Sequence, residues 1–312
     1  MIGCMKKQIG IGAALVLALG LGWSAFFWPQ AELKAVPEQS QAASSAPAKK
    51  AQKKTPDSLD GAMVPHKALY EITMVSAASG SQVVNISGNM FFEWKPTCDA
   101  WTTDHRFNLT YEYADSPAMQ ITSDFSTWES RDGKSFDFSS RRSRDGELYE
   151  ELRGHVDRLG DGSGKAVYTL PENLSFDLPK GFVLPMQHTL DILSVIDKSN
   201  SPFVNRVLFD GSDTEGPIEV NAFIGKSVNA MARLPVNAEL DVSLLNAPAR
   251  DVRMAFFPLL DPETESSDYE MNAVFHDNGV ISDMMIDYHE FSIHQKLIAL
   301  EKTKIDLNCD AN

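Results

Sequence analysis

Segments in which apolar and polar residues alternate recur along most of the chain from Pro65 onward. In the clearest segment, residues 102–113, the odd and even positions differ in character. The odd positions carry Thr103, His105, Phe107, Leu109, Tyr111 and Tyr113, and the even positions carry Thr102, Asp104, Arg106, Asn108, Thr110 and Glu112. A period of two places the two sets on opposite faces of a β-strand. The same pattern occurs over residues 67–74 and, less strictly, over residues 280–293.

Turn residues separate these segments and predict how the strands connect. Asp-Gly, Asn-Gly and related pairs favour the positive φ of tight hairpins, and they occur at residues 79–80, 132–133, 145–146, 160–162, 210–211 and 278–279. Further strands are predicted at residues 82–94, 118–128, 134–142, 147–158, 165–170, 202–209, 217–224, 236–245, 250–257 and 269–276. Consecutive hairpins of this kind predict an all-β fold, built as an antiparallel meander.

Residues 185–198 depart from this rhythm. Leu190, Leu193 and Ile196 recur at helical spacing, and Pro185 stands at a position where a helix can begin. We therefore expect one amphipathic helix at about residues 185–198, which would cover one mouth or the concave face of a curved sheet. Its apolar side chains are expected to be core residues rather than a cofactor pocket.

The N-terminal 30 residues have the layout of an export signal. Lys6 and Lys7 precede an uncharged apolar run from Ile9 to Trp28, and about 20 residues at roughly 1.5 Å each can cross a hydrocarbon core of about 30 Å. Residues 1–30 are either an uncleaved signal anchor or a signal peptide cleaved near residues 18–20. In both cases the positive N-terminus places the bulk of the chain beyond the membrane.

Composition divides the remaining chain into a linker and a folded domain. Residues 31–61 are mostly Ala, Ser, Gln, Pro and Lys, so they cannot bury a core and are predicted to be a flexible linker. Residues 62–312 are then the folded domain. From residue 61 onward the chain carries 21 Lys and Arg against 39 Asp and Glu, a net charge of −18. Such a charge repels polyphosphate, so no nucleic-acid partner is expected.

The three cysteines differ in the surroundings that their positions predict. Cys4 precedes the apolar run, on the reducing side of the membrane or in a discarded peptide. Cys98 and Cys309 fall in the exported part, where they either form a disulfide or stay as two buried free thiols. A bond between them would close almost the whole domain into a ring. The lost conformational entropy would raise the free energy of the unfolded chain by roughly 5 kcal/mol.

Motifs that would indicate catalysis or metal binding fail on their spacing. Residues 160–165 resemble a phosphate-binding loop but lack its first glycine and its Ser/Thr, and they are predicted to form a hairpin turn. His289 and His294 are five residues apart, which places them on opposite faces of a strand. The acidic run from Asp261 to Glu270 lacks the regular ligand spacing of a calcium loop. We therefore predict no metal, no cofactor and no catalytic residues.

A series of short blocks resembles the cell-envelope integrity protein family typified by EipB. They follow one another in order over about four-fifths of the chain, from Pro65 to Cys309. The blocks are residues 66–71, 87–88, 93–94, 98–103, 128–133 and 136–138, then Ala166-Val167-Tyr168-Thr169-Leu170-Pro171, residues 178–182, residues 184–188 and finally Leu208-Phe209-Asp210-Gly211-Ser212-Asp213.

This resemblance implies a periplasmic β-spiral in a Gram-negative cell. The family's fold is a long antiparallel sheet coiled into a broken barrel, similar to the half-barrels of periplasmic lipoprotein carriers, with a helix near its concave side. It also implies a disulfide between Cys98 and Cys309. The family is not an enzyme family and is linked to cell-envelope integrity. The linker and a retained anchor would distinguish this chain from a freely diffusing periplasmic protein.

Three functions are compatible with these features. In the first, the concave face of the sheet binds an apolar ligand or a partner, and its lining is sought among Tyr70, Phe107, Leu109, Tyr111, Met186 and Leu190, each of which could equally be ordinary core. In the second, the protein is a scaffold that recruits envelope proteins without a ligand cavity. In the third, dispersed carboxylates form a hydrolase site. The partners expected are a lipid, a lipoprotein or a periplasmic protein, together with the inner membrane if the anchor is retained.

Overall fold

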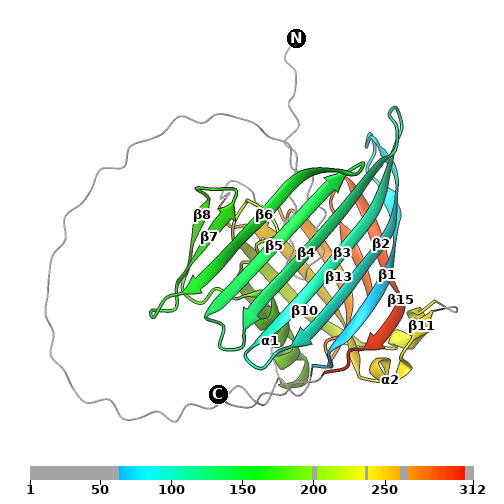
Figure 1. The fold of residues 1–312 in the computed structure, drawn as a ribbon. Coiled ribbons are helices and arrows are strands. Elements are labelled where there is room, and N and C mark those ends of the chain that lie inside the picture. The colour runs from blue at the N-terminus through cyan, green and yellow to red at the C-terminus, as the bar shows by residue number, and fades with distance from the viewer. Residues whose placement is uncertain (1–62, 199–201, 236–237, 261–265, 306–312) are drawn as a thin grey trace, which may run out of the picture.

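The computed structural model describes residues 63–198, 202–235, 238–260 and 266–305. Most of them lie in one 15-stranded sheet, which curves round so that the described chain forms an open barrel (Figure 1). Each hairpin connection joins neighbouring antiparallel strands, and the predicted all-β meander is therefore confirmed.

The elements follow one another in this order along the chain. They are β1 (His66–Ala77), β2 (Val83–Pro96), β3 (Ala100–Tyr113), β4 (Met119–Ser130), β5 (Ser135–Arg144), β6 (Glu147–Arg158), β7 (Gly164–Leu170), β8 (Ser175–Leu178), α1 (Pro185–Lys198), β9 (Phe203–Leu208), β10 (Ile218–Val228), the 3-10 helix η1 (Ala230–Arg233), β11 (Glu239–Leu240), α2 (Val242–Leu245), β12 (Ala249–Pro258), β13 (Tyr269–His276), β14 (Ile281–Asp287) and β15 (Phe291–Lys302).

The strand order shows how a meander becomes a barrel. From one end of the sheet to the other it reads β8-β7-β6-β5-β4-β3-β2-β1-β15-β14-β13-β12-β10-β9, with β11 paired in parallel to β15 outside this path. The first and last long strands of the domain pair with each other, Ala68 opposite Leu300. The two halves of the chain therefore meet at β1 and β15, and the ends of the sheet are β8 and β9.

The alternation in β3 sets which side chains face the interior. The odd positions from Trp101 to Tyr111 are buried, and the even positions from Thr102 to Glu112 are half-buried or exposed. β1 repeats the pattern, with Ala68 and Ile72 buried and Glu71 exposed. Because side chains alternate strictly along a strand, one apolar face is sufficient to fix the inside of the barrel.

The gap between β8 and β9 is spanned by the segment that leads into α1. Val183 N–H donates to Val207 O at 2.8 Å, and Phe209 N–H donates to Val183 O at 3.1 Å. A short parallel bridge between Val183 and Leu208 results. These contacts bring the two ends of the sheet together and place the start of α1 beside the barrel interior.

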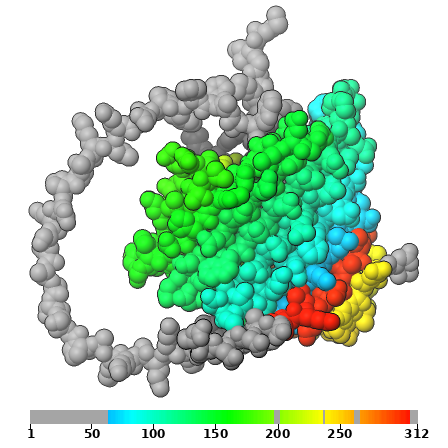
Figure 2. Space-filling view, viewed as in Figure 1, coloured from blue at the N-terminus to red at the C-terminus, as the bar shows by residue number. Residues whose placement is uncertain are grey.

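The interior is packed in two main apolar clusters. The larger one includes side chains of β1 to β4, of β9 to β15 and of α1, and the smaller one gathers aromatic residues of β4 to β8 such as Phe136, Phe138 and Tyr168. The opposite faces of β1 to β8 form the continuous outer wall seen in Figure 2. Among the described residues no helix has the length and hydropathy needed to span a membrane. The predicted signal or anchor and the linker lie outside them.

Two strand predictions are wrong. Residues 236–245 were predicted as a strand, but the described part, residues 238–245, has only the two-residue β11, followed by α2. Asp241 caps that helix, because its carboxylate accepts the backbone N–H of Ser243 at 3.1 Å and so favours a helical turn. Residues 280–293 are two strands rather than one, since a turn at His289, with φ of 64°, separates β14 from β15.

Candidate functional site

The helix α1 begins without a capping side chain of its own. His188 N–H donates to Leu184 O at 2.9 Å, which makes Leu184 the N-cap residue, and leucine offers no side-chain acceptor. Glu129, at the end of β4, takes that role from across the fold. Its Oε2 accepts the N–H of Met186 at 2.8 Å and its Oε1 accepts the N–H of Gln187 at 3.1 Å.

Glu129 is almost fully buried, with 1% of its surface exposed. Burial raises the pKa of its carboxyl to about 8, while the two backbone N–H groups and the nearby Arg158 oppose that rise. A helix N-terminus stabilises negative charge, so the carboxyl is placed where its ionised form has the best available partners. The two hydrogen bonds from α1 to Glu129 therefore attach the helix to the barrel wall through a buried carboxyl group that can titrate.

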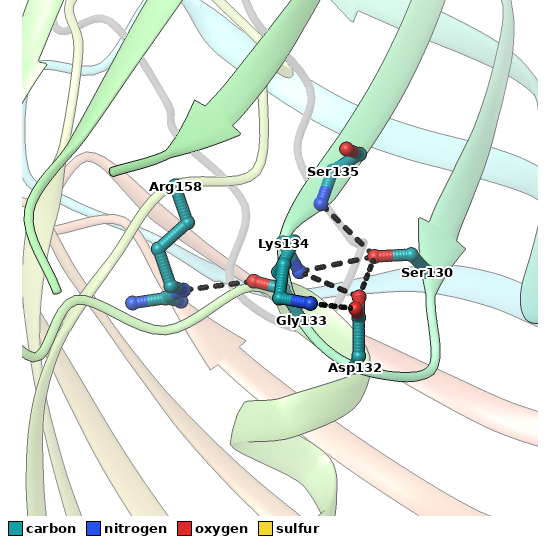
Figure 3. Close-up of polar contacts among 6 residues, drawn as sticks. All are labelled: Ser130, Asp132, Gly133, Lys134, Ser135 and Arg158. Atoms are coloured by element: carbon teal, nitrogen blue, oxygen red, sulfur yellow. Dashed lines mark hydrogen bonds and ion pairs between the residues drawn. The ribbon is translucent and has the colours of Figure 1, made fainter. Parts of the chain in front are cut away.

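Arg158, at the end of β6, holds the segment that precedes α1. Its Nε donates to Gly133 O at 2.8 Å, its Nη2 donates to Phe182 O at 3.0 Å, and its guanidinium lies 3.9 Å from the centre of the Phe182 ring. Figure 3 shows Arg158 reaching the β4–β5 turn, in which Ser130 Oγ donates to Asp132 and accepts two backbone N–H groups. This turn directly follows Glu129 in the chain. The hydrogen bonds of the turn and of Arg158 therefore hold both the Glu129 carboxylate and the segment before α1 in position.

A cavity of about 60 Å³ lies between the first turns of α1 and the concave face of the sheet. Its walls come from α1 and from two groups of strands that are far apart in the sequence, β1 to β3 and β13 to β14. The lining residues are Met63, His66, Tyr70, Met90, Phe92, Trp94, Thr103, His105, Pro185, Met186, Thr189, Phe275, Gly279, Ile281 and Met284. The lining is mainly apolar, with a few polar side chains gathered on β1 and β3.

His105 projects from β3 and is 3% exposed. Neither of its ring nitrogens has a hydrogen-bond partner, although the ring packs against Phe92 at 4.7 Å and Phe125 at 6.2 Å between centroids. Burial lowers its pKa well below the usual value, so the ring is neutral. A neutral imidazole carries one N–H donor and one acceptor, and both are available here.

His66 begins β1 and is 1% exposed. Its Nδ1 lies 2.8 Å from Val64 O and 3.1 Å from Nε1 of Trp94, while its Nε2 has no partner. The indole N–H can only donate and the carbonyl can only accept, so a neutral Nδ1 satisfies one of the two at a time. Burial lowers the pKa of His66 to about 4. The ring is therefore neutral at neutral pH, with one protonated and one unprotonated nitrogen.

The structure places the six residues predicted from the sequence to line a concave face as follows. Tyr70 and Met186 line the cavity, and Tyr70 Oη donates to Ile281 O at 2.8 Å. The other four, Phe107, Leu109, Tyr111 and Leu190, are buried in the larger apolar cluster without lining the cavity. Contact of any of the six with a ligand stays a prediction.

The sequence patterns assigned no role to the polar residues that define the site. Glu129 occurred only within a family block, and the signal that could have revealed it is the missing cap residue before Pro185. His105 was predicted to share a strand face with Phe107 and Leu109, as it does, but its unpaired nitrogens follow from contacts with other strands. His66 could not be connected to Trp94 before β1 and β2 were aligned.

Other predicted sites have simpler structures. His289 Nε2 donates one hydrogen bond to Ser267 O at 2.7 Å, and His294 pairs with Asp283 at 2.8 Å. Within the described residues no group of three or more His, Cys, Asp or Glu is arranged to hold a metal ion. Residues 160–162 form a turn between β6 and β7. Cys309 lies outside the described residues, so its disulfide with Cys98 stays a prediction.

The fold and the site together define an all-β protein whose open 15-stranded sheet curls around a helix and encloses a small, mainly apolar cavity. Residues 59–304 match the EipB-like family. The chain belongs to this family, and the resemblance expected from its sequence blocks is confirmed.

Two matches come from Brucella abortus, one to a curated protein and one to a solved structure. One, from strain 2308, is named cell envelope integrity protein EipB and is 26% identical over 245 residues, which are 77% of this chain and 84% of that protein. The other is the crystal structure of a β-barrel-like protein of the domain of unknown function DUF1849. It superposes with a TM-score of 0.70 at 26% identity, covering 78% of this chain and 99% of the other.

Proposed function

We propose that this protein is a non-catalytic component of the Gram-negative cell envelope that helps to maintain envelope integrity from the periplasm. It does so by binding an apolar ligand, or an apolar segment of an envelope protein, at the concave face of its sheet. The name of the Brucella abortus relative supports the envelope role. The N-terminal export segment supports the location.

The observation that carries the binding proposal is the cavity beneath α1. Apolar walls with a few convergent polar groups are characteristic of small-molecule sites, and the lining has this composition. Its volume of about 60 Å³ has room for roughly four to six water-sized groups at about 10–15 Å³ each. With α1 in place, the cavity therefore takes one end of a larger ligand rather than the whole of it.

Native mass spectrometry of the full chain purified from the cell envelope tests the proposal. We expect an adduct of defined mass on the wild-type protein. Thr189→Phe, on α1, places a ring into the cavity and should remove the adduct, whereas Thr73→Phe, on the exposed face of β1, should keep it. Wild-type protein without any adduct under mild conditions, or equal adducts in both variants, would contradict binding in this cavity.

A second function, scaffolding of envelope proteins, is favoured by one surface feature. Phe203 and Phe223 are opposite one another on β9 and β10, at the end of the sheet, and are 50% and 52% exposed. Two adjacent exposed aromatic rings at a sheet edge are suited to an apolar partner surface. If scaffolding is the function, serine at both positions should abolish envelope integrity in detergent-resistance assays without lowering the melting temperature, and Thr189→Phe should leave it intact.

A further inference from the structure

We propose that the cavity beneath α1 binds the neutral, hydrogen-bonding end of an apolar ligand, such as a hydroxyl or an amide group, and rejects carboxylate and phosphate ends. His105 and His66 are the residues that bind this group. The inference rests on the proposed binding function and adds to it the chemistry of the group that enters the cavity.

The first observation is the lack of partners on His105. Both ring nitrogens are buried and unpaired in a side chain that lines the cavity. A buried polar atom without a partner is energetically unfavourable, and almost all buried polar atoms in folded proteins are satisfied. A ligand group that both donates and accepts would satisfy the two functions of this ring together.

The second observation is the arrangement of His66, Trp94 and Val64. Because Nδ1 of His66 satisfies only one of its two neighbours, its unpaired Nε2 can present either a proton or a lone pair to the cavity. When Nε2 carries the proton, Nδ1 accepts from Trp94, and when Nδ1 carries it, Nδ1 donates to Val64 O. A ligand that donates to Nε2 selects the tautomer with the proton on Nδ1, and a ligand that accepts from Nε2 selects the tautomer with the proton on Nε2. The same site can bind groups of either hydrogen-bonding sense.

The third observation is a pair of hydroxyl groups beside His105. Thr103 lines the cavity, and its Oγ1 lies 2.6 Å from Oγ1 of Thr127. Two hydroxyls that share one hydrogen bond use only one of their two protons. When Thr127 donates this bond, the proton of Thr103 is available for a further acceptor, and Thr103 then adds a third polar group to the same wall of the cavity.

The absence of charge in the lining decides which ligand ends are accepted. None of the residues that line the cavity is Lys, Arg, Asp or Glu. The two histidines are neutral because burial disfavours their protonated forms, and the first N–H groups of α1 are already bound by Glu129. Burying an ion without a counter-charge is strongly unfavourable. A carboxylate or a phosphate would therefore have no partner able to offset its lost hydration.

NMR of the protein isolated from the cell envelope, with ¹³C-labelled methionine methyl groups, tests this chemistry. Met90, Met186 and Met284 line the cavity, and Met254 and Met271 are buried elsewhere and serve as internal references. We expect 1-butanol to cause saturable shifts of these three methyls and of the fourth lining methionine, Met63, and not of the references. Butyrate, which has the same chain length and a negative charge, should cause none.

Variants at His105 separate hydrogen bonding from shape. His105→Phe keeps an aromatic ring but removes both polar atoms, and it should weaken butanol binding about tenfold, equivalent to roughly 1.4 kcal/mol. His105→Gln keeps a donor and an acceptor and should largely retain binding. His155→Phe, on a partly exposed site of β6, is the control and should bind as the wild type does.

Each outcome decides the inference. Equal shifts with butanol and butyrate, unchanged butanol affinity in His105→Phe, or no saturable shift at the lining methyls would overturn it. If such a result accompanies a ligand adduct that is lost in Thr189→Phe, the proposed binding function stands and only the chemistry assigned to the ligand end is wrong.

Discussion

The buried contact between Glu129 and α1 can be tested by Glu129→Gln. Glutamine has one acceptor oxygen, so it can bind only one of the N–H groups of Met186 and Gln187, and its own NH₂ group faces the other. One orphaned, fully buried N–H costs about 1–3 kcal/mol. We expect the variant to lose about this much free energy of unfolding at pH 6.

The pH dependence of this difference tests the perturbed pKa of Glu129. Its folded pKa of about 8 exceeds the ordinary value of 4.5, so between these values the folded state binds more protons than the unfolded state. The contribution of Glu129 to stability is therefore complete below pH 4.5 and decreases as the pH rises towards 8. Glutamine does not titrate, so the deficit of the variant should shrink over this interval.

Urea unfolding of both proteins from pH 5 to pH 8.5 measures the difference directly. Other titrating groups, such as Asp210, contribute equally to both proteins and cancel. Glu71→Gln, on the exposed face of β1, is the control and should match the wild type at every pH. A deficit that grows with pH would show that the helix N-terminus lowers the carboxyl pKa. A deficit below about 0.5 kcal/mol throughout, the range of ordinary surface substitutions, would refute the capping role.

Four further predictions concern other parts of the chain. His66, whose pKa is lowered from 6.5 to about 4, should make the protein lose about 3 kcal/mol of stability as the pH falls through this interval, a loss that His66→Phe removes in acid-unfolding curves. Gly154→Ala should lower stability by about 1–3 kcal/mol, because a Cβ there would lie 2.4 Å from an aromatic carbon, whereas Gly160→Ala meets nothing within 4 Å and should be neutral by thermal melting. If Cys98 and Cys309 are bonded, reductant lowers the melting temperature and the two serine variants are non-additive; identical melting with and without reductant would exclude the bond. If the N-terminal segment is retained as an anchor, the full-length protein partitions into detergent on phase separation, and recovery in the aqueous phase would indicate cleavage.

The local pattern of the sequence was sufficient to predict the class of fold and most of its elements. Alternation over residues 102–113 separated the two faces of β3, and the helix was placed at residues 185–198, where α1 lies. These features depend on neighbours a few residues apart, so backbone periodicity reveals them. The prediction failed at residues 236–245, where a single capping side chain, Asp241, favours a helical turn over an extended strand.

Only the tertiary structure could decide the site, because its contacts join residues far apart in the chain. The pairing of β1 with β15 brings Tyr70 to Ile281, and the curl of the sheet brings Glu129 to the N-terminus of a helix that begins 56 residues later, at Pro185. The sequence by itself determined that His105 lies on the same face of its strand as Phe107 and Leu109. That both of its nitrogens remain unpaired in a cavity depends on what the other strands and α1 place around it, and no local pattern contains that information.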